Sequence, residues 1–142
     1  MNKSKLMEIL PHRPPMLLLD EVELKDDGTC VSRCTVQGDE FFLQGHFPGN
    51  PVVPGVILCE MMAQSACLVV GDKGTAGKLP LLTGLDKIRF RHKVVPGDTV
   101  VFEVRLTRSR EPFYFVEGTG CVGEDVCIKG EISFALVDLP AA

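Results

Sequence analysis

The chain has 142 residues, of which 45% are hydrophobic and 24% charged, and its formal net charge is −4. This length fits a single domain over residues 1–142, and such a domain buries roughly 68–70% of its unfolded surface, enough for a hydrophobic core. The composition is that of a globular protein rather than a disordered one, and the acidic balance does not favour nucleic acid as a partner.

The sequence contains no candidate for a membrane segment. A span needs about 18 uninterrupted apolar residues, and the most apolar stretch is broken by Glu60 and Gln64. Near the N-terminus, Glu8 and Pro11 interrupt what would have to be the apolar region of a secretory signal. We therefore expect a cytoplasmic protein that has no membrane partner.

Six cysteines are present, an even number that would permit disulfides: Cys30, Cys34, Cys59, Cys67, Cys121 and Cys127. Their spacing contains no Cys-x-x-Cys pair, so reduced cysteines acting as small apolar side chains are the better interpretation. The three histidines lie near no paired cysteines, and no metal site is predicted.

In chain order, the pattern first predicts a short helix over 3–10 and then a hairpin. Asp27-Gly28 is typical of a tight turn between antiparallel strands, so the hairpin joins strands over 16–24 and 30–37.

A long irregular loop over 38–53 leads into a helix over 54–70. Pro54 is compatible with a helix start, because proline is tolerated in the first turn. Apolar residues lie on nearly every side of this helix, so it must be buried on most sides. Three glycines then indicate a loop: Gly71, Gly74 and Gly77.

The remaining segments read as four strands joined by short turns: 81–93, 99–108, 113–122 and 126–137. Alternation of apolar and polar residues places Val100, Phe102, Val104 and Leu106 on one buried face. Short turns favour antiparallel pairing, so the fold class is α+β, with one antiparallel sheet wrapped around one long central helix. The open edge of such a sheet favours association with a second subunit.

Two polar residues on the apolar helix are candidates for chemistry. Glu60 and Gln64 are four apart and share a face. Desolvation is expected to raise the pKa of Glu60, and a carboxyl group that keeps its proton near neutral pH can act as a general acid. Gln64 is placed to orient it. The alternative is a glutamate that reaches water or pairs with an arginine.

A histidine lies in a loop of restricted shape just before this helix. Residues 45–55 read GHFPGNPVVPG, so prolines and glycines surround His46 and limit the loop to few conformations. Histidine accepts a proton readily near pH 7. A solvated, inert histidine is the simpler alternative, and a proline-rich ligand for an aromatic groove is another.

Gly55 falls in the first turn of the helix, where N–H groups lack partners and the helix dipole is positive. A substrate carbonyl could approach that N–H closely, as in an oxyanion site. A base, an acid and an oxyanion site so near one another predict proton abstraction next to a carbonyl.

Cations alternate with other residues along the strand 81–93: Lys87, Arg89, Arg91 and Lys93. They form either a solvated strand face or a docking stripe for an anionic partner.

Three segments resemble the 3-hydroxyacyl-[acyl-carrier-protein] dehydratases of bacterial type II fatty acid synthesis. They are GHFPGNPVVPGVILCEMMAQ (45–64), ILPHRPPMLLLDEV (9–22) and LDKIRFRHKVVPGD (85–98). The resemblance implies the hot-dog fold and a dimer whose sheets join edge to edge, with three dimers forming a hexamer. It implies an active site at the dimer interface, with His46 from one subunit and Glu60 from the other.

The implied reaction removes water from a (3R)-3-hydroxyacyl thioester and gives the trans-2-enoyl thioester. His46 would take the C2 proton, Glu60 would protonate the leaving hydroxyl, and Gly55 N–H would hold the thioester oxygen. Phe47, Val56 and Gln64 complete the expected substrate-binding set. No metal or organic cofactor is expected. The substrate arrives on the phosphopantetheine of acidic acyl carrier protein, for which Arg89, Arg91 and Lys93 are the expected docking residues.

Two positions separate this chain from a sister group that also isomerises the double bond, which has aspartate in place of Glu60 and cysteine in place of Val56. The residues here favour a dehydratase without isomerase activity. Pro14, Met16 and Leu81-Leu82 stand where aromatic residues are frequent in the family, and these differences bear on the acyl tunnel. Alternative functions are a hot-dog thioesterase, a hydratase of coenzyme A esters and a non-catalytic acyl-binding subunit.

Overall fold

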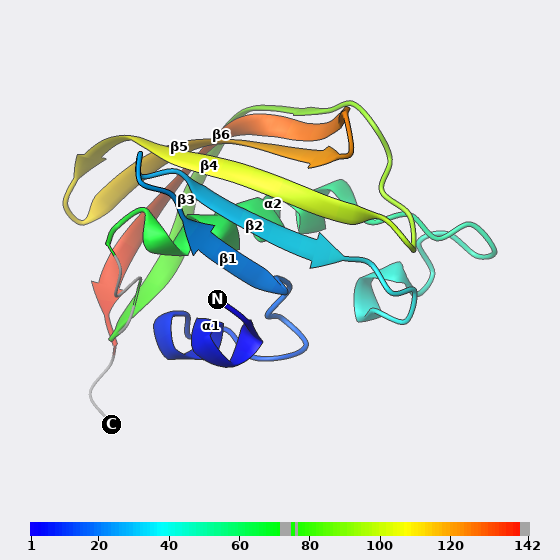
Figure 1. Ribbon diagram of the computed structural model, residues 1–142, viewed down its shortest axis with the longest axis horizontal. Coiled ribbons are helices and arrows are strands. Elements are labelled where there is room, and N and C mark those ends of the chain that lie inside the picture. Colours follow the sequence, from blue (N-terminus) through cyan, green and yellow to red (C-terminus); the bar gives the residue numbers. More distant parts are fainter. Residues whose placement is uncertain (72–74, 76, 140–142) are drawn as a thin grey trace.

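A computed structural model describes residues 1–71, 75 and 77–139, and its strands form one antiparallel sheet that curves around a helix (Figure 1). The strand order is β1-β2-β4-β5-β6-β3. The strands are β1 (Glu21–Leu24), β2 (Cys30–Thr35), β3 (Lys78–Phe90), β4 (Thr99–Arg110), β5 (Phe113–Val122) and β6 (Asp125–Asp138). The helices are α1 (Lys3–Ile9) and α2 (Gly55–Ser65), with short 3₁₀ turns η1 (Phe41–Leu43) and η2 (Ala66–Leu68). The predicted α+β architecture is confirmed.

The helix α2 packs directly on the inner face of the sheet. A Cβ added to Gly118 of β5 would lie 2.7 Å from Sδ of Met62, so only glycine lets the strand approach the helix this closely. Met61 and Met62 are fully buried. On β4 the predicted alternation buries Val100, Phe102 and Val104. Leu106 departs from it and is 38% exposed, just before a register shift in the β4–β5 ladder.

The predicted strand over 16–24 is wrong in its first half. Only Glu21–Leu24 pairs with β2. The preceding leucines at 17–19 are buried, but the backbone there bonds a side chain instead of a strand: Leu18 N donates to Oε1 of Gln64 at 3.0 Å. The apolar run therefore reflects burial beside α2 and not sheet pairing.

The central helix is shorter than predicted. Pro54 precedes the first helical residue, and its carbonyl accepts from Ile57 and Leu58. The α-helix ends at Ser65, and the chain tightens into η2 because Ala66 N bonds residues two and three positions earlier. The predicted loop glycines Gly71 and Gly77 lie between η2 and β3, while Gly74 is outside the described residues.

All six cysteines are free, and every one except Cys121 is buried. Burial raises the pKa of the Cys34 thiol to about 12, with a smaller effect from the nearby Asp20 carboxylate. Burial likewise raises the pKa of Cys30 to about 11. The predicted role as small apolar side chains is confirmed for the five buried cysteines, which belong to the hydrophobic core.

Within the described part of the chain, none of the helices combines the length and apolar character needed to cross a membrane. The described residues also contain no group of three or more histidine, cysteine, aspartate or glutamate side chains arranged to hold a metal ion.

Candidate active site

The loop that carries His46 has the restricted shape predicted from its sequence. Gly45 and Gly49 have φ of 82° and 71°, conformations that favour glycine. Val52 N donates to His46 O at 2.8 Å, and Val53 N donates to Val94 O at 2.9 Å, which ties the loop to the segment before β4. In Figure 1 the loop between η1 and α2 extends outward from the body of the molecule.

The side chain of His46 is oriented by the loop's own backbone. Its Nδ1 lies 2.8 Å from Val52 O. A carbonyl oxygen only accepts, so Nδ1 carries the proton and the lone pair is on Nε2. The ring of Phe47 stacks on the imidazole with 4.2 Å between centroids, and Phe47 is itself 55% exposed. His46 therefore presents a basic nitrogen that is orientated before any substrate binds.

Gly55 begins α2, as predicted. Among the described residues, neither Gly55 N–H nor Val56 N–H has a hydrogen-bond acceptor. The glycine also has a packing role, because a Cβ there would lie 2.9–3.2 Å from ring atoms of Phe90. Val56 is 73% exposed. Two free amide donors beside an uncovered apolar residue suit a thioester carbonyl and the start of an acyl chain.

Glu60 and Gln64 lie on one face of α2 and contact each other, as their spacing predicted. Gln64 is 2% exposed and its Nε2 donates to Glu60 Oε2 at 2.8 Å. The same nitrogen donates to Met16 O at 2.8 Å. Gln64 thus holds both the carboxylate and the backbone at Met16 in place.

His12 is a second neighbour of Glu60, and the sequence interpretation missed it. Its Nε2 lies 3.5 Å from Glu60 Oε2. Burial acts to raise the pKa of Glu60, but the hydrogen bonds from His12 and Gln64 outweigh it, so the pKa lies below its ordinary value. The predicted upward shift is wrong for the single chain. His12 is distant in sequence from Glu60, and only its place in the segment 9–22 could have pointed to it.

One chain does not bring all the predicted groups together. Glu60 lies in a pocket of about 60 Å³ that Pro80 and Leu82 of β3 and Phe134 of β6 also line. His46 is not among the residues around this pocket. Glu60 and Gln64 therefore meet, while His46 is on the projecting loop and does not line their pocket.

The predicted cationic stripe is modified by a bulge in β3. A register shift lies between Asp86 and Arg89, and Lys87 has φ of 54°, so the cations do not alternate regularly. Arg89 and Arg91 nonetheless line one groove of about 450 Å³, but Lys93 does not.

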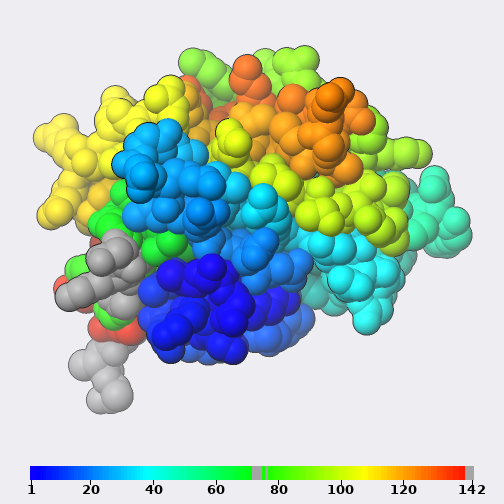
Figure 2. Space-filling model, viewed as in Figure 1, coloured from blue at the N-terminus to red at the C-terminus, as the bar shows by residue number. Residues whose placement is uncertain are grey.

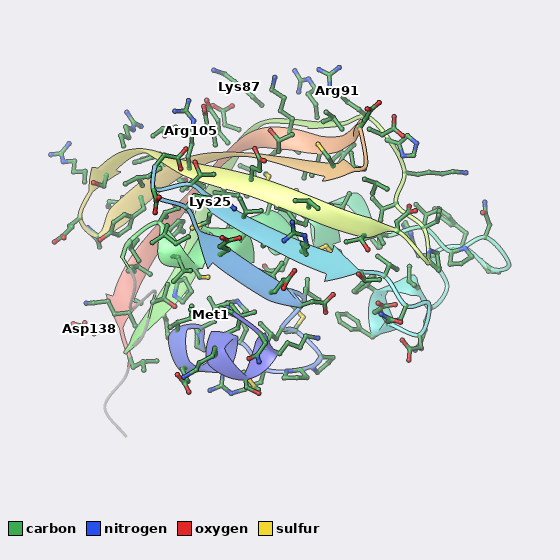
Figure 3. All side chains as sticks on the ribbon, in the orientation of Figure 1. Met1, Lys25, Lys87, Arg91, Arg105 and Asp138 are labelled. Atoms are coloured by element: carbon green, nitrogen blue, oxygen red, sulfur yellow. The ribbon has the colours of Figure 1, made fainter. Side chains whose placement is uncertain are left out.

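This groove also contains charges that the sequence interpretation did not include. Its cations are Lys87, Arg89, Arg91, Arg105 and Lys129, and its acids are Glu103, Glu117 and Glu131. Figure 3 shows Lys87, Arg91 and Arg105 on the side of the molecule away from α1. Glu117 and Gly118 are consecutive residues of β5, so they point to opposite faces of the sheet. Gly118 faces α2, and Glu117 lines the groove. The groove is therefore on the face of the sheet opposite to α2 and Glu60.

The space-filling view in Figure 2 shows the loop after η1 and the upper side of the sheet. The residues after η1 form a protrusion at one end, and β4 and β5 form a broad upper surface. No described residue that lines the charged groove belongs to the loop of His46, so the two are separate features of one chain.

Comparison with known proteins gives consistent matches along the chain. A family model described as a FabA-like domain matches residues 10–131. The chain is 42% identical to "3-hydroxyacyl-[acyl-carrier-protein] dehydratase FabZ" of Alkaliphilus metalliredigens, over 97% of this chain and 95% of that protein. It is 41% identical to the protein of the same name from Clostridium perfringens, over 96% and 99% of the two chains.

Solved structures share the fold. The dehydratase heterocomplex ApeI:P from Xenorhabdus doucetiae superposes with a TM-score of 0.77 at 25% identity, covering 92% of this chain and 89% of that one. A fluoroacetyl-CoA-specific thioesterase, FlK, gives a TM-score of 0.65 at 15% identity over 78% and 93% of the chains. The second likeness concerns the fold alone.

Proposed function

Because this chain belongs to the FabA-like family, we infer that it dehydrates (3R)-3-hydroxyacyl-acyl carrier protein to trans-2-enoyl-acyl carrier protein in fatty acid biosynthesis. It is an enzyme of the hydro-lyase class with the hot-dog fold. The FabZ relatives match over nearly the whole chain, so the similarity includes both the loop of His46 and the helix of Glu60.

In the proposed mechanism His46 is the base. The observation that carries this assignment is the 2.8 Å contact of its Nδ1 with Val52 O, which leaves Nε2 free to take the C2 proton of the substrate. As that proton leaves, negative charge develops on the thioester oxygen. Gly55 N–H and Val56 N–H at the start of α2 are free to hold it.

Glu60 is the proposed acid that protonates the 3-hydroxyl, which then leaves as water. Its pKa is low in the single chain. A second subunit that covers Glu60 would remove water from the carboxyl group and raise its pKa, which favours the protonated form that the reaction needs. The reaction moves only protons and water, so we propose that it needs neither a metal nor an organic cofactor.

The proposed site is shared between two subunits that pair through β3. Leu82, Leu85 and Phe90 lie opposite Phe134, Ile132 and Ile128 of β6, so both sets point to the α2 side of the sheet. The β6 residues are buried, but the β3 residues are 51%, 47% and 53% exposed.

A long edge strand with an uncovered apolar stripe is a template for pairing with another chain. A second copy placed there would cover this stripe and bring the projecting loop of His46 towards Glu60. We extend the proposal to a trimer of such dimers, as the family resemblance implies, and to a cytoplasmic location, where the carrier protein is used.

The direct test is incubation of the protein with a crotonyl thioester of pantetheine. Hydration removes the conjugated enoyl absorbance without releasing thiol, and this is the expected result. Release of free thiol with unchanged acyl chemistry would show a thioesterase and overturn the proposed function. If the enoyl absorbance stays unchanged and no thiol is released, while the acyl thioester still binds, the protein would be a non-catalytic acyl-binding subunit.

Arg89 and Arg91 are the proposed docking residues for the acidic carrier protein. Reversing both to glutamate should lower kcat/KM for acyl-carrier substrates by roughly 10-fold or more, because electrostatic attraction mainly sets the rate of encounter. The rate with acyl-pantetheine should change little, and steady-state kinetics with both substrates measures the difference.

The matched control is Lys5→Glu, because Lys5 is an exposed cation on α1 and does not line the charged groove. It should leave both substrates unaffected. Because the groove is on the opposite face of the sheet from Glu60, the carrier's arm must pass around the sheet. An equal loss with carrier and pantetheine substrates would instead show that these arginines support the fold.

A further inference from the structure

The position of the proton on Glu60 follows from how Gln64 is held. The Gln64 amide has its orientation set by backbone groups, because Leu18 N–H must face the oxygen and Met16 C=O must face the nitrogen. Its Nε2 therefore donates to Glu60 Oε2. A proton on Oε2 would point at another donor, so the acidic proton of Glu60 belongs on Oε1.

His12 approaches the same oxygen. Its Nε2 is 3.5 Å from Oε2, at the outer limit of a hydrogen bond, and catalytic hydrogen bonds are often long before substrate binds. Its Nδ1 is buried and has no hydrogen-bond partner among the described residues. A proton on Nδ1 would be a buried, unsatisfied donor. The neutral ring with its proton on Nε2 fits this environment, and such a ring donates to Oε2.

We propose that His12 is a positioning residue for the reaction: together with Gln64 it holds Oε2 of Glu60 by hydrogen bonds and so directs the proton-bearing Oε1 towards the substrate. This inference rests on the proposed function for its catalytic consequence. The orientation of the carboxyl group itself depends only on the contacts within one chain.

Among the described residues that line the pocket of Glu60, His12 is the other side chain that can carry a charge. Around the pocket, β3 contributes Pro80 and Leu82, β6 contributes Phe134, and α2 contributes Ala63 and Gln64. None of these side chains titrates. Arg13 follows His12 directly, but its Nη1 donates to the carbonyls of Leu10 and His12.

The test compares His12→Ala with His12→Gln. Loss of the donor in His12→Ala should lower kcat with acyl-pantetheine on the order of 10-fold through misplacement of the acid, with little change in KM. One limb of the pH–rate profile should also move to higher pH, because the carboxylate loses a hydrogen bond that stabilises it. His12→Gln, whose amide donates without titrating, should restore most of both properties.

A readout without turnover separates this inference from the proposed function. The titration of Glu60 can be followed by carbon NMR of protein labelled at its glutamate carboxyls, with the resonance assigned by its loss in Glu60→Gln. The pKa of Glu60 should rise in His12→Ala even if the protein proves not to be a dehydratase. His92→Ala is the matched control, since His92 Nε2 lies 3.6 Å from Asp125 Oδ2, on a surface not assigned to the site.

Two outcomes would overturn the inference. The first is an unchanged Glu60 titration in His12→Ala. The second is a rate loss that His12→Gln does not restore, which would show that the imidazole acts by its shape or charge rather than as a neutral donor.

Discussion

Replacing His46 with alanine, or Glu60 with glutamine, is expected to lower kcat/KM for a crotonyl or 3-hydroxybutyryl thioester by roughly 10²–10⁴-fold, the usual contribution of a general acid or base. Without the imidazole, nothing on the loop takes the C2 proton. In Glu60→Gln the new amide would keep the shape of the side chain and its contact with Gln64, but it has no proton that it can give to the hydroxyl. Steady-state rates from the enoyl absorbance measure both effects.

The controls are chosen for matched chemistry. His92→Ala removes an exposed imidazole, and Glu131→Gln neutralises a carboxylate of the outer groove. Both should keep most of the activity with small thioesters. Circular dichroism and thermal unfolding should show that the His46 and Glu60 variants are folded. Full activity in both of those variants would mean that the chemistry lies elsewhere.

Mixing the two inactive variants is expected to restore activity. If each site takes His46 from one subunit and Glu60 from the other, a mixed dimer has one site with both native groups and one with neither. Random exchange in an equal mixture makes about half of the dimers mixed, so activity should reach about a quarter of the wild-type value. The measurement is the rate after verified subunit exchange, compared with each variant alone.

The interface itself can be tested within this experiment. Adding Leu85→Asp to both inactive variants places a charge on the uncovered β3 stripe, and recovery should then be lost. Leu24→Asp is the matched control, because Leu24 is 38% exposed at the other edge of the sheet, on β1. Recovery should survive that change. Subunit exchange without any return of activity would contradict a site divided between chains.

The strands that follow α2 were predictable because their signals are local. The strand predicted over 113–122, which a turn was expected to follow, has the same bounds as β5 in the structure. The Asp27-Gly28 turn located the hairpin, and Gly28 has the positive φ of 88° that such a turn favours. Burial misled the prediction at 16–20, where Gln64 bonds the backbone from another element.

In the candidate site too, features that depend on neighbouring residues were predicted, and contacts from distant elements were missed. Glu60 and Gln64 could be paired from their helical spacing, and the proline-glycine composition around His46 predicted a fixed loop. Helix spacing says nothing about neighbours from other elements, so His12 was missed and the direction of the Glu60 pKa was wrong. The bulge at Lys87 likewise broke an alternation that sequence alone suggested.

The sequence by itself determined the order of elements, the restricted loop of His46 and the pairing of Glu60 with Gln64, since each depends on residues within a few positions of one another. Only the tertiary structure decided which groups share an oxygen of Glu60 and which face of the sheet carries the cations. Those facts depend on contacts such as the one from Gln64 to Met16, 48 residues away, and burial against a distant segment leaves no local pattern.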